Sequence, residues 1–463
     1  MDSRVRHFFD SIYGKKIAFC GIGISNLPLC ALFAKYGARV IACDRKDRQA
    51  LGEFGQKLEE YGIALKCGPD YLENLDVDII FRTPGIYYNM EKLQQYRRAG
   101  VVVTSEMEVF FDLCPCKIYG VTGSDGKTTT TTLISEMLKK AGRNVYLGGN
   151  IGIPLLPQIE KITADDVAVA ELSSFQLISM RKSPDVAVIT NLAPNHLNVH
   201  KTMEEYVDAK KNLILHQNAF SRTVLNADND ITAAMQPLAR GECSLFSRRQ
   251  PVKNGAFCDE QGRMYLVRQG VKQFVMHKSD IRIPGEHNVE NYLAAMAAVA
   301  DEVEPEEMVE VAKTFGGVEH RIEFVRELDG VRYYNDSIAT SPSRVIAGLK
   351  AFGRKIIVIA GGYDKDIPYG PLGPYLTEFV KTLVLLGATA DKIEAAAKAA
   401  PDYKPGSPEI IRVQTLEQAV SAARDAAQPG DIVTLSPASA SFDLYRNFEE
   451  RGQHFKRIVN ELA

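Results

Sequence analysis

A glycine-rich segment at residues 120–128 limits the folds that are open to this chain. Gly120-Val-Thr-Gly-Ser-Asp-Gly-Lys-Thr128 follows a β-branched and aromatic run at 117–121 and precedes a helical run at 129–140. Between a strand and a helix, such a turn cradles phosphates with its backbone N–H groups and with the positive end of the helix dipole. Lys127 then offers a charge to the outer phosphates and Thr128 a hydroxyl to Mg²⁺. The segment predicts an α/β domain that binds ATP or GTP.

The general P-loop pattern is not matched in full. Five residues separate Gly120 from Gly126, where that pattern has four. A glycine-rich connector without a ligand is the alternative, but such a connector does not require Gly123, Gly126, Lys127 and two following threonines together. The nucleotide prediction therefore stands.

Acidic and imidazole groups follow two of the expected strands. Glu171 comes directly after the apolar run 167–170, and His196 follows the strand that ends at Thr190. Because α/β folds bind their ligands at the carboxyl ends of strands, both side chains are expected at one edge of the sheet. Mg²⁺ prefers oxygen ligands, so Glu171 is the first candidate to hold it and His196 the second.

Short apolar runs alternate with helical stretches along the chain, which is the pattern of βαβ units and parallel sheets. At about 150 residues per domain, 463 residues predict three domains. We expect an α/β protein with an N-terminal Rossmann-like domain at 1–113, a central P-loop ATPase-like mononucleotide-binding domain at 114–317 and a C-terminal Rossmann-like domain at 318–463. Turn-rich alternation at 223–282 predicts a small antiparallel insertion in the central domain. Strands are expected at 16–20, 39–43, 77–81, 101–104, 117–121, 167–170, 186–190, 355–360, 382–386 and 431–435, and helices at 28–36, 129–140 and 288–301.

Charge and hydropathy exclude several classes of protein. The chain has 55 Lys and Arg against 58 Asp and Glu, and a net charge of −3 provides no global field for nucleic acid or an anionic membrane. The apolar run 292–300 has nine residues, whereas a membrane-spanning helix needs about 20, so no membrane insertion is expected. Residues 1–10 lack the apolar region of a secretory signal, which predicts a cytoplasmic protein.

Cys114 and Cys116 have no second Cys/His pair at finger-like spacing and are expected to be structural.

Seven separated motifs together resemble one enzyme family. The segments 120–128 and 171–176, with Asn195-His196 and His320-Arg321, closely resemble the Mur ligases, which are ATP-dependent amide-forming enzymes of peptidoglycan precursor synthesis. The segments 148–154, 335–340 and 435–443, the last followed by Asn447-Phe448, look like the branch of the family that adds D-glutamate. The resemblance covers essentially the whole chain. It implies ATP and Mg²⁺ as cofactors, UDP-N-acetylmuramoyl-L-alanine and D-glutamate as substrates, ADP and phosphate as products, and a monomer.

The resemblance also implies roles for individual residues. The residues expected to bind ATP are Gly123, Asp125, Gly126, Lys127, Thr128, Thr129, Asn288, Arg321 and Asp336. Those expected around the UDP substrate are Ser25, Asn26, Asp44, Arg45, Thr83, Pro84, Gly85, Asn150 and Ser173. Those expected to hold D-glutamate are Thr340, Lys365, Ser441 and Phe448. The metal ligands would be Thr128, Glu171, His196 and Lys210 as a carbamate, with Lys127, His196 and Lys210 as the catalytic residues.

Two positions depart from the pattern of the family. Many relatives have a lysine where this chain has Ile338, so one cationic contact near ATP or glutamate is absent. Asn195 stands where an acid is common, which predicts a less negative second metal site.

The implied reaction has two steps. The substrate carboxylate attacks the γ-phosphate to give an acyl phosphate, and the amino group of glutamate then displaces phosphate. Three alternatives remain open. A sister ligase of the same fold would add another amino acid or polyglutamate to another acid. A nicotinamide oxidoreductase would use Gly21, Gly23 and Asp44, although Asn26 occupies the third glycine position of that fingerprint. A regulatory P-loop module would bind ATP without turnover.

Overall fold

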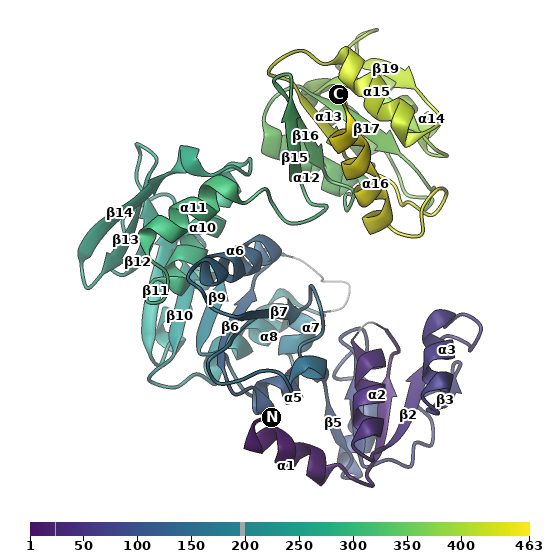
Figure 1. Cartoon of the computed structure of the whole chain (residues 1–463), viewed down its shortest axis with the longest axis vertical. Helices are drawn as coiled ribbons and strands as arrows, with labels where there is room; N and C mark the ends of the chain where they lie inside the picture. The colour runs from purple at the N-terminus through teal and green to yellow at the C-terminus, as the bar shows by residue number, and fades with distance from the viewer. Residues whose placement is uncertain (24, 195–199) are drawn as a thin grey trace. The chain divides into compact units, whose positions relative to one another are not determined.

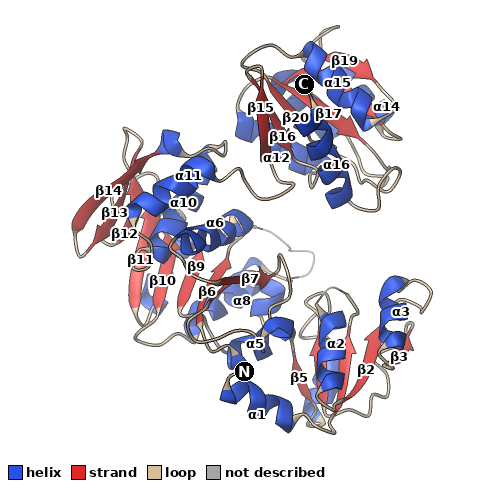
Figure 2. Ribbon diagram, in the orientation of Figure 1, coloured by secondary structure: helices blue, strands red, loops and turns tan. Residues whose placement is uncertain are grey.

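The computed structural model describes residues 1–23, 25–194 and 200–463. The chain forms two compact units, one made of 1–278 and 290–311 and the other of 279–289 and 312–463. Three separate sheets, each flanked by helices, lie along the chain in order (Figure 1, Figure 2). This is the expected three-domain α/β fold, whereas the boundaries at 113 and 317 stay a prediction.

The first sheet has the strand order β3-β2-β1-β4-β5, and all its strands are parallel. Its central strand is apolar and buried on both faces, as a strand flanked by helices must be. Strand β3 was not expected from the sequence. Its four residues, Ala-Leu-Lys-Cys, mix apolar and charged side chains, and none of them is fully buried. The strands are β1 (Lys16–Cys20), β2 (Arg39–Asp44), β3 (Ala64–Cys67), β4 (Ile79–Arg82) and β5 (Val102–Thr104), and the helices are α1 (Ser3–Ser11), α2 (Asn26–Lys35), α3 (Glu53–Glu60), α4 (Glu91–Arg98) and α5 (Glu106–Leu113).

The second sheet has the order β14-β13-β12-β11-β10-β9-β6-β8-β7. Its strands are β6 (Lys117–Thr122), β7 (Val145–Gly149), β8 (Val167–Glu171), β9 (Val186–Ile189), β10 (Arg222–Asn226), β11 (Glu242–Ser247), β12 (Gly255–Cys258), β13 (Arg263–Arg268) and β14 (Val271–His277). The helices that accompany it are α6 (Lys127–Lys140), η1 (Leu156–Gln158), α7 (Ser174–Leu177), α8 (Met203–Leu215), α9 (Asp230–Ala233), η2 (Gln236–Leu238), η3 (Lys278–Asp280), α10 (Glu286–Val299) and α11 (Pro305–Thr314).

The expected antiparallel insertion at 223–282 is wrong in its first half. Strands β10 and β11 continue the parallel sheet beyond β9, and only β12, β13 and β14 pair antiparallel. The reason is that Val224 and Leu225 are fully buried, as in a strand covered on both faces. The helical turns α9 and η2 lie between β10 and β11 and supply the crossover that a parallel pair requires.

The third sheet, in the second unit, has the order β15-β16-β20-β17-β18-β19 and is parallel except for the pair β15 and β16. Its strands are β15 (Glu323–Leu328), β16 (Val331–Asn335), β17 (Ile356–Gly361), β18 (Val380–Leu386), β19 (Glu409–Arg412) and β20 (Ile432–Leu435). The helices are α12 (Pro342–Phe352), η4 (Gly370–Leu372), α13 (Gly373–Phe379), α14 (Ala390–Lys398), α15 (Leu416–Ala426) and α16 (Phe448–Glu461).

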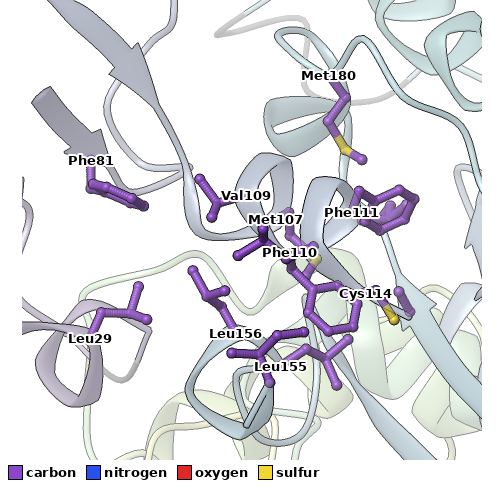
Figure 3. Close-up of a cluster of buried hydrophobic side chains, with 14 of the residues drawn as sticks. Leu29, Phe81, Met107, Val109, Phe110, Phe111, Cys114, Leu155, Leu156 and Met180 are labelled. Carbon is purple, nitrogen blue, oxygen red and sulfur yellow. The ribbon is translucent and has the colours of Figure 1, made fainter. Parts of the chain in front are cut away.

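Within the first unit, one apolar cluster joins the first and second sheets. It includes Phe81 of β4, Ile189 of β9 and, between them, residues of α5 such as Phe110. Figure 3 shows Phe110 beside Leu155 and Leu156, which belong to the segment after β7. Because α5 supplies side chains to a core shared with the second sheet, it is a packed element and not a loose linker.

The cysteine pair at 114 and 116 lies at the end of α5. Its two sulfur atoms are 3.4 Å apart and both residues are buried. The described part of the chain contains no group of three or more His, Cys, Asp or Glu residues placed to hold a metal ion. No helix in the described ranges is long and apolar enough to cross a membrane.

Candidate active site

The phosphate loop consists of the four residues between β6 and α6. Gly123 has φ +155°, and a Cβ there would lie 1.9 Å from Thr190 Oγ1. Gly126 has φ +76°, and a Cβ there would lie 2.3 Å from Asn291 Oδ1. Both positions therefore need glycine for conformation and for space. The loop ends at the N-terminus of α6, where backbone N–H groups are available to an anion.

Gly120 does not belong to this loop. It lies inside β6, where a Cβ would come within 2.7 Å of Pro184 Cγ. The glycine is needed for packing against the segment before β9. The missing match to the general P-loop spacing is thereby explained, because the loop of this chain begins at Gly123.

Asn191 holds the loop in place. Its backbone oxygen accepts the Ser124 N–H at 2.8 Å, and its side-chain oxygen accepts the Asp125 N–H at 2.9 Å. Lys127 donates from Nζ to the Ser124 carbonyl at 2.8 Å. The lysine that is expected at the outer phosphates thus lies folded over the loop.

Glu171 ends β8, the neighbour of β6 in the sheet, and is 1% exposed. Asn150 donates from Nδ2 to Oε1 of Glu171 at 2.8 Å. Among the described residues, none donates a hydrogen bond to the other oxygen, Oε2, which is also buried. A buried carboxylate oxygen without a donor is costly unless a cation binds it. The arrangement therefore fits a Mg²⁺ ion held by Glu171.

Lys210 lies on α8 and bonds the start of the phosphate loop. Its Nζ donates to Thr122 Oγ1 and to the Gly123 carbonyl, each at 2.9 Å, and the residue is 1% exposed. Burial lowers the pKa of Lys210 well below its ordinary value, and the charge of Lys127 lowers it further. Lys211, the next residue, instead pairs with Asp208 at 2.7 Å near the surface. The two adjacent lysines thus have different environments.

His196 and Asn195 lie outside the described residues. The histidine that the structure describes nearby is His200, which the sequence did not single out. It is fully buried, its Nε2 lies 2.8 Å from Ser174 Oγ, and its ring stacks on Phe175 at 5.1 Å. These contacts link the segment before α8 to the first turn of α7.

Residues expected around the UDP substrate meet at the carboxyl edge of the first sheet. Asn26 donates from Nδ2 to the Gly21 carbonyl at 3.0 Å, and Asp44 accepts the Ile22 N–H at 2.6 Å. A Cβ on Gly21 would lie 2.5 Å from Thr83 Oγ1. The loops after β1, β2 and β4 therefore touch one another. Ser25 precedes α2, and Arg45, Pro84 and Gly85 follow their strands on the same loops.

Asn150 and Ser173 belong to the second sheet instead. Asn150 follows β7 and bonds Glu171, as described above. Ser173 caps α7: its Oγ accepts the Gln176 N–H at 3.3 Å, and Gln176 accepts the Ser173 N–H at 2.9 Å. Both residues therefore have a local structural task beside the Glu171 carboxylate.

In the second unit, Asp336 follows β16 and is buried. Its carboxylate accepts from Ser436 Oγ at 2.8 Å and from the Ile322 N–H at 3.3 Å. Burial raises the pKa of Asp336 to about 7, and the charges of Arg321 and Arg344 oppose that rise. Arg344 donates to the Ile338 carbonyl at 2.9 Å, so a cation does lie beside the position where relatives have a lysine. Asn288, at the start of α10, donates to the Pro284 carbonyl.

Three of the four residues expected to hold D-glutamate lie on loops after β16, β17 and β20, which are neighbours in the third sheet. These are Thr340, Lys365 and Ser441, with Lys365 exposed and Ser441 buried, whereas Phe448 is the first residue of α16. Arg451, which the sequence did not single out, donates to Ser337 Oγ at 3.0 Å and to the Ala440 carbonyl at 3.1 Å. It therefore ties the loop after β16 to the loop after β20.

Family models match most of the chain. The Mur ligase middle domain matches residues 121–299, and the Mur ligase glutamate ligase domain matches 320–439. The chain is 52% identical over 466 residues to the UDP-N-acetylmuramoylalanine–D-glutamate ligase of Acetivibrio thermocellus, and 49% over 463 residues to that of Clostridium botulinum strain Alaska E43. Each match covers 100% of both chains. The chain belongs to the Mur ligases.

Solved Mur ligases share the fold at low identity. The UDP-N-acetylmuramate-alanine ligase of Thermotoga maritima is 18% identical, with a TM-score of 0.58 over 96% of this chain and 99% of its own. A pseudomurein peptide ligase type C from Methanothermus fervidus is 18% identical, with a TM-score of 0.52 over 97% and 100%. The architecture of this Mur ligase is thus that of its family.

Several side chains that organise the site were not found from the sequence. They are Asn191, Arg82, His200 and Arg451, to which the sequence assigned no role. A signal existed for Arg82, because a charged residue closes an otherwise apolar strand directly before Thr83. Arg451 lies in the polar helix α16, where nothing in the sequence distinguishes it from exposed arginines.

Proposed function

We propose that this Mur ligase joins D-glutamate to UDP-N-acetylmuramoyl-L-alanine with the hydrolysis of ATP to ADP and phosphate. The observation that carries the proposal is the end-to-end identity of 52% with a relative named for this reaction. Because ATP is a cytoplasmic cosubstrate, we infer that the reaction takes place in the cytoplasm. The three domains of the proposal are 1–113 for the UDP substrate, 114–317 for ATP and 318–463 for D-glutamate.

The chemical problem is that a carboxylate repels nucleophiles. Transfer of the γ-phosphoryl group to the substrate carboxylate makes an acyl phosphate, which the amino group of D-glutamate can attack. The N–H groups of residues 123–129 and the Lys127 ammonium would bind the phosphates and stabilise the charge on the transferring group. Mg²⁺, when bound, supplies further neutralisation of that charge. No side chain of the protein needs to act as a nucleophile.

The residues present fit a magnesium site at the end of β8. Glu171 provides a buried oxygen to which no described residue donates, Asn150 orients the other oxygen, and Thr128 lies in the first turn of α6. We propose Glu171 and Thr128 as ligands of one ion, and His196 with carbamylated Lys210 at a second. The lowered pKa of Lys210 supports this, since only an unprotonated amine reacts with CO₂.

The two other substrates would bind at sheet edges described above. We assign the UDP part to the loops that carry Ser25, Asn26, Asp44, Arg45 and Thr83 to Gly85. We assign D-glutamate to the edge of the third sheet that carries Thr340, Lys365, Ser441 and Phe448. We also assign Asn288, Arg321 and Asp336 to ATP binding, and we expect the protein to act as a monomer.

The decisive experiment is a phosphate-release screen with ATP, Mg²⁺ and UDP-N-acetylmuramoyl-L-alanine against all D- and L-amino acids. D-Glutamate should give the highest rate, and Lys127→Ala should reduce that rate at least tenfold without changing the affinity for UDP. A better rate with L-glutamate or a basic amino acid would assign the chain to a sister ligase. Nucleotide binding with no amino-acid-dependent turnover would leave a regulatory module.

A further inference from the structure

Arg82 is the last residue of β4 and is buried, with 1% of its surface exposed. Its guanidinium makes hydrogen bonds on two sides. Nη1 donates to the Ile86 carbonyl at 3.2 Å, within the loop that follows β4. Nη2 donates to the Phe175 carbonyl at 3.1 Å and to Ser179 Oγ at 2.7 Å, on and just after α7. One side chain thus connects the first sheet to the second.

On the first sheet, the bonded loop is the one proposed for the UDP substrate. The Thr83 N–H donates to the Cys20 carbonyl at 3.0 Å, and the Ile86 N–H donates to the Thr83 carbonyl at 3.0 Å. Arg82 binds the outer carbonyl of this turn, at Ile86. It therefore holds residues 83–86 at the end of the turn that is not bonded to the Cys20 carbonyl.

On the second sheet, the bonded segment is close to the magnesium carboxylate. Phe175 is four residues after Glu171, and the capping box of Ser173 and Gln176 makes the start of α7 rigid. Ser179 also bonds helix α5, because its Oγ donates to Glu108 Oε2 at 2.9 Å. The charge of Glu108 opposes the effect of burial, which lowers the pKa of Arg82. The two Nη atoms of the guanidinium are thus bonded on both sides, whereas its buried Nε has no hydrogen-bond partner among the described residues.

The proposed substrate has its nucleotide at one end and its reacting carboxylate at the other. The two ends would bind loops of different sheets, so the spacing between these loops decides whether the carboxylate reaches the γ-phosphate. Small misplacements of reacting groups cost orders of magnitude in rate. We propose that Arg82 is a positioning residue that sets the spacing between the UDP-binding loop and the edge of the second sheet. The proposal rests on the proposed function.

The test is Arg82→Met in the full-length protein, assayed by D-glutamate-dependent phosphate release. We expect kcat/KM for UDP-N-acetylmuramoyl-L-alanine to fall at least tenfold, mainly through kcat. The Kd for UDP alone and the KM for ATP should stay within twofold, because each of these ligands needs only one of the two sheets. The matched control is Arg97→Met. Arg97 stacks on the Tyr88 ring at 3.8 Å, and Arg82 lies over the same ring at 5.3 Å. The Arg97 guanidinium donates to the Tyr88 carbonyl, which belongs to its own domain.

A second variant covers the case in which Arg82→Met does not fold. Ser179→Ala removes one hydrogen bond on the second sheet and should lower kcat/KM about threefold. The double variant of Arg82→Met and Ser179→Ala should have the same kcat/KM as Arg82→Met alone. Wild-type kcat/KM in Arg82→Met would overturn the proposal, as would a parallel loss of UDP affinity or an equal rise of the KM for ATP. If the wild-type protein itself shows no D-glutamate-dependent phosphate release, the proposed function fails instead.

Discussion

Glu106 is a buried acid that joins two parts of the first unit, and its replacement by glutamine should change stability in a pH-dependent manner. It is the first residue of α5, and its Oε1 accepts the N–H groups of Leu155 at 2.9 Å and Leu156 at 2.8 Å. Figure 3 shows both leucines in the apolar cluster beside Met107 and Phe110. Burial raises the pKa of Glu106 to about 7, and the two hydrogen bonds oppose that rise.

The sign of the effect follows from linkage. A carboxyl group whose pKa is higher in the folded state binds its proton more tightly there, so folding is favoured at low pH. The contribution is complete below pH 4.5 and is lost as the pH rises through about 7. The difference between the two pKa values corresponds to roughly 3 kcal/mol, of which about 2.5 kcal/mol is lost between pH 5 and pH 8.

Glutamine keeps the carbonyl oxygen that accepts both N–H groups and carries no charge at any pH. Glu106→Gln should therefore be about as stable as the wild type at pH 5 and more stable by about 2.5 kcal/mol at pH 8. The chain has no tryptophan, so urea unfolding is followed by circular dichroism. Hydrogen exchange measures the local effect. The exchange rate of peptides that contain Leu155 and Leu156 is compared between the variant and the wild type at each pH.

The control is Glu91→Gln, an exposed acid on α4 that pairs with Arg98. This change should alter the free energy of unfolding by no more than about 0.5 kcal/mol at either pH. The reasoning about Glu106 is refuted if the difference between variant and wild type is the same at pH 5 and pH 8. It is also refuted if the variant is the less stable protein at pH 8.

Three further predictions concern the site. Gly126→Ala should lower kcat/KM for ATP at least tenfold, because a Cβ would collide with the Asn291 side chain. The control Gly142→Ala should leave ATP kinetics within twofold, because Gly142 has a similar φ of +78° and a Cβ there would have no atom within 4 Å. Glu171→Gln should lower kcat about a hundredfold and raise the Mg²⁺ concentration needed for half-maximal rate, with an unchanged Kd for UDP, and an unchanged Mg²⁺ requirement would contradict the assigned ligand. Lys210→Ala should be inactive and partly recover with acetate or formate, whereas Lys211→Ala should keep wild-type activity; full activity of Lys210→Ala would contradict its role.

Much of the fold could be predicted because its parallel strands are buried on both faces. Runs such as Val167 to Ala170 are apolar throughout, which is visible without any partner. The segment 223–282 was harder, because the pairing direction of β10 and β11 depends on which strand lies beside them. Local sequence contains turn residues but not the identity of the neighbouring strand. The antiparallel prediction therefore held only from β12 onward.

The residues of the candidate site also differ in whether local sequence is enough to predict them. Residues whose expected role rests on a local motif, such as Gly126 and Lys127, could be named from the sequence. Residues that act through distant partners could not: Arg82 reaches Phe175, and Arg451 reaches Ser337. Each bond spans about a hundred residues, so no window of sequence contains both ends. Such residues become visible only when the packing of the sheets is known.

For Lys210, the sequence and the structural environment together support one hypothesis. As an ammonium it would lie buried beside Lys127, and burial together with that like charge disfavours the protonated form. The free amine can add to CO₂ and release one proton, which produces an anionic carbamate in place of a cation. A carbamate supplies the oxygen ligands that Mg²⁺ prefers, and its negative charge would be attracted to Lys127 rather than repelled. The environment that makes an unmodified lysine unfavourable here is therefore the one that favours its modification.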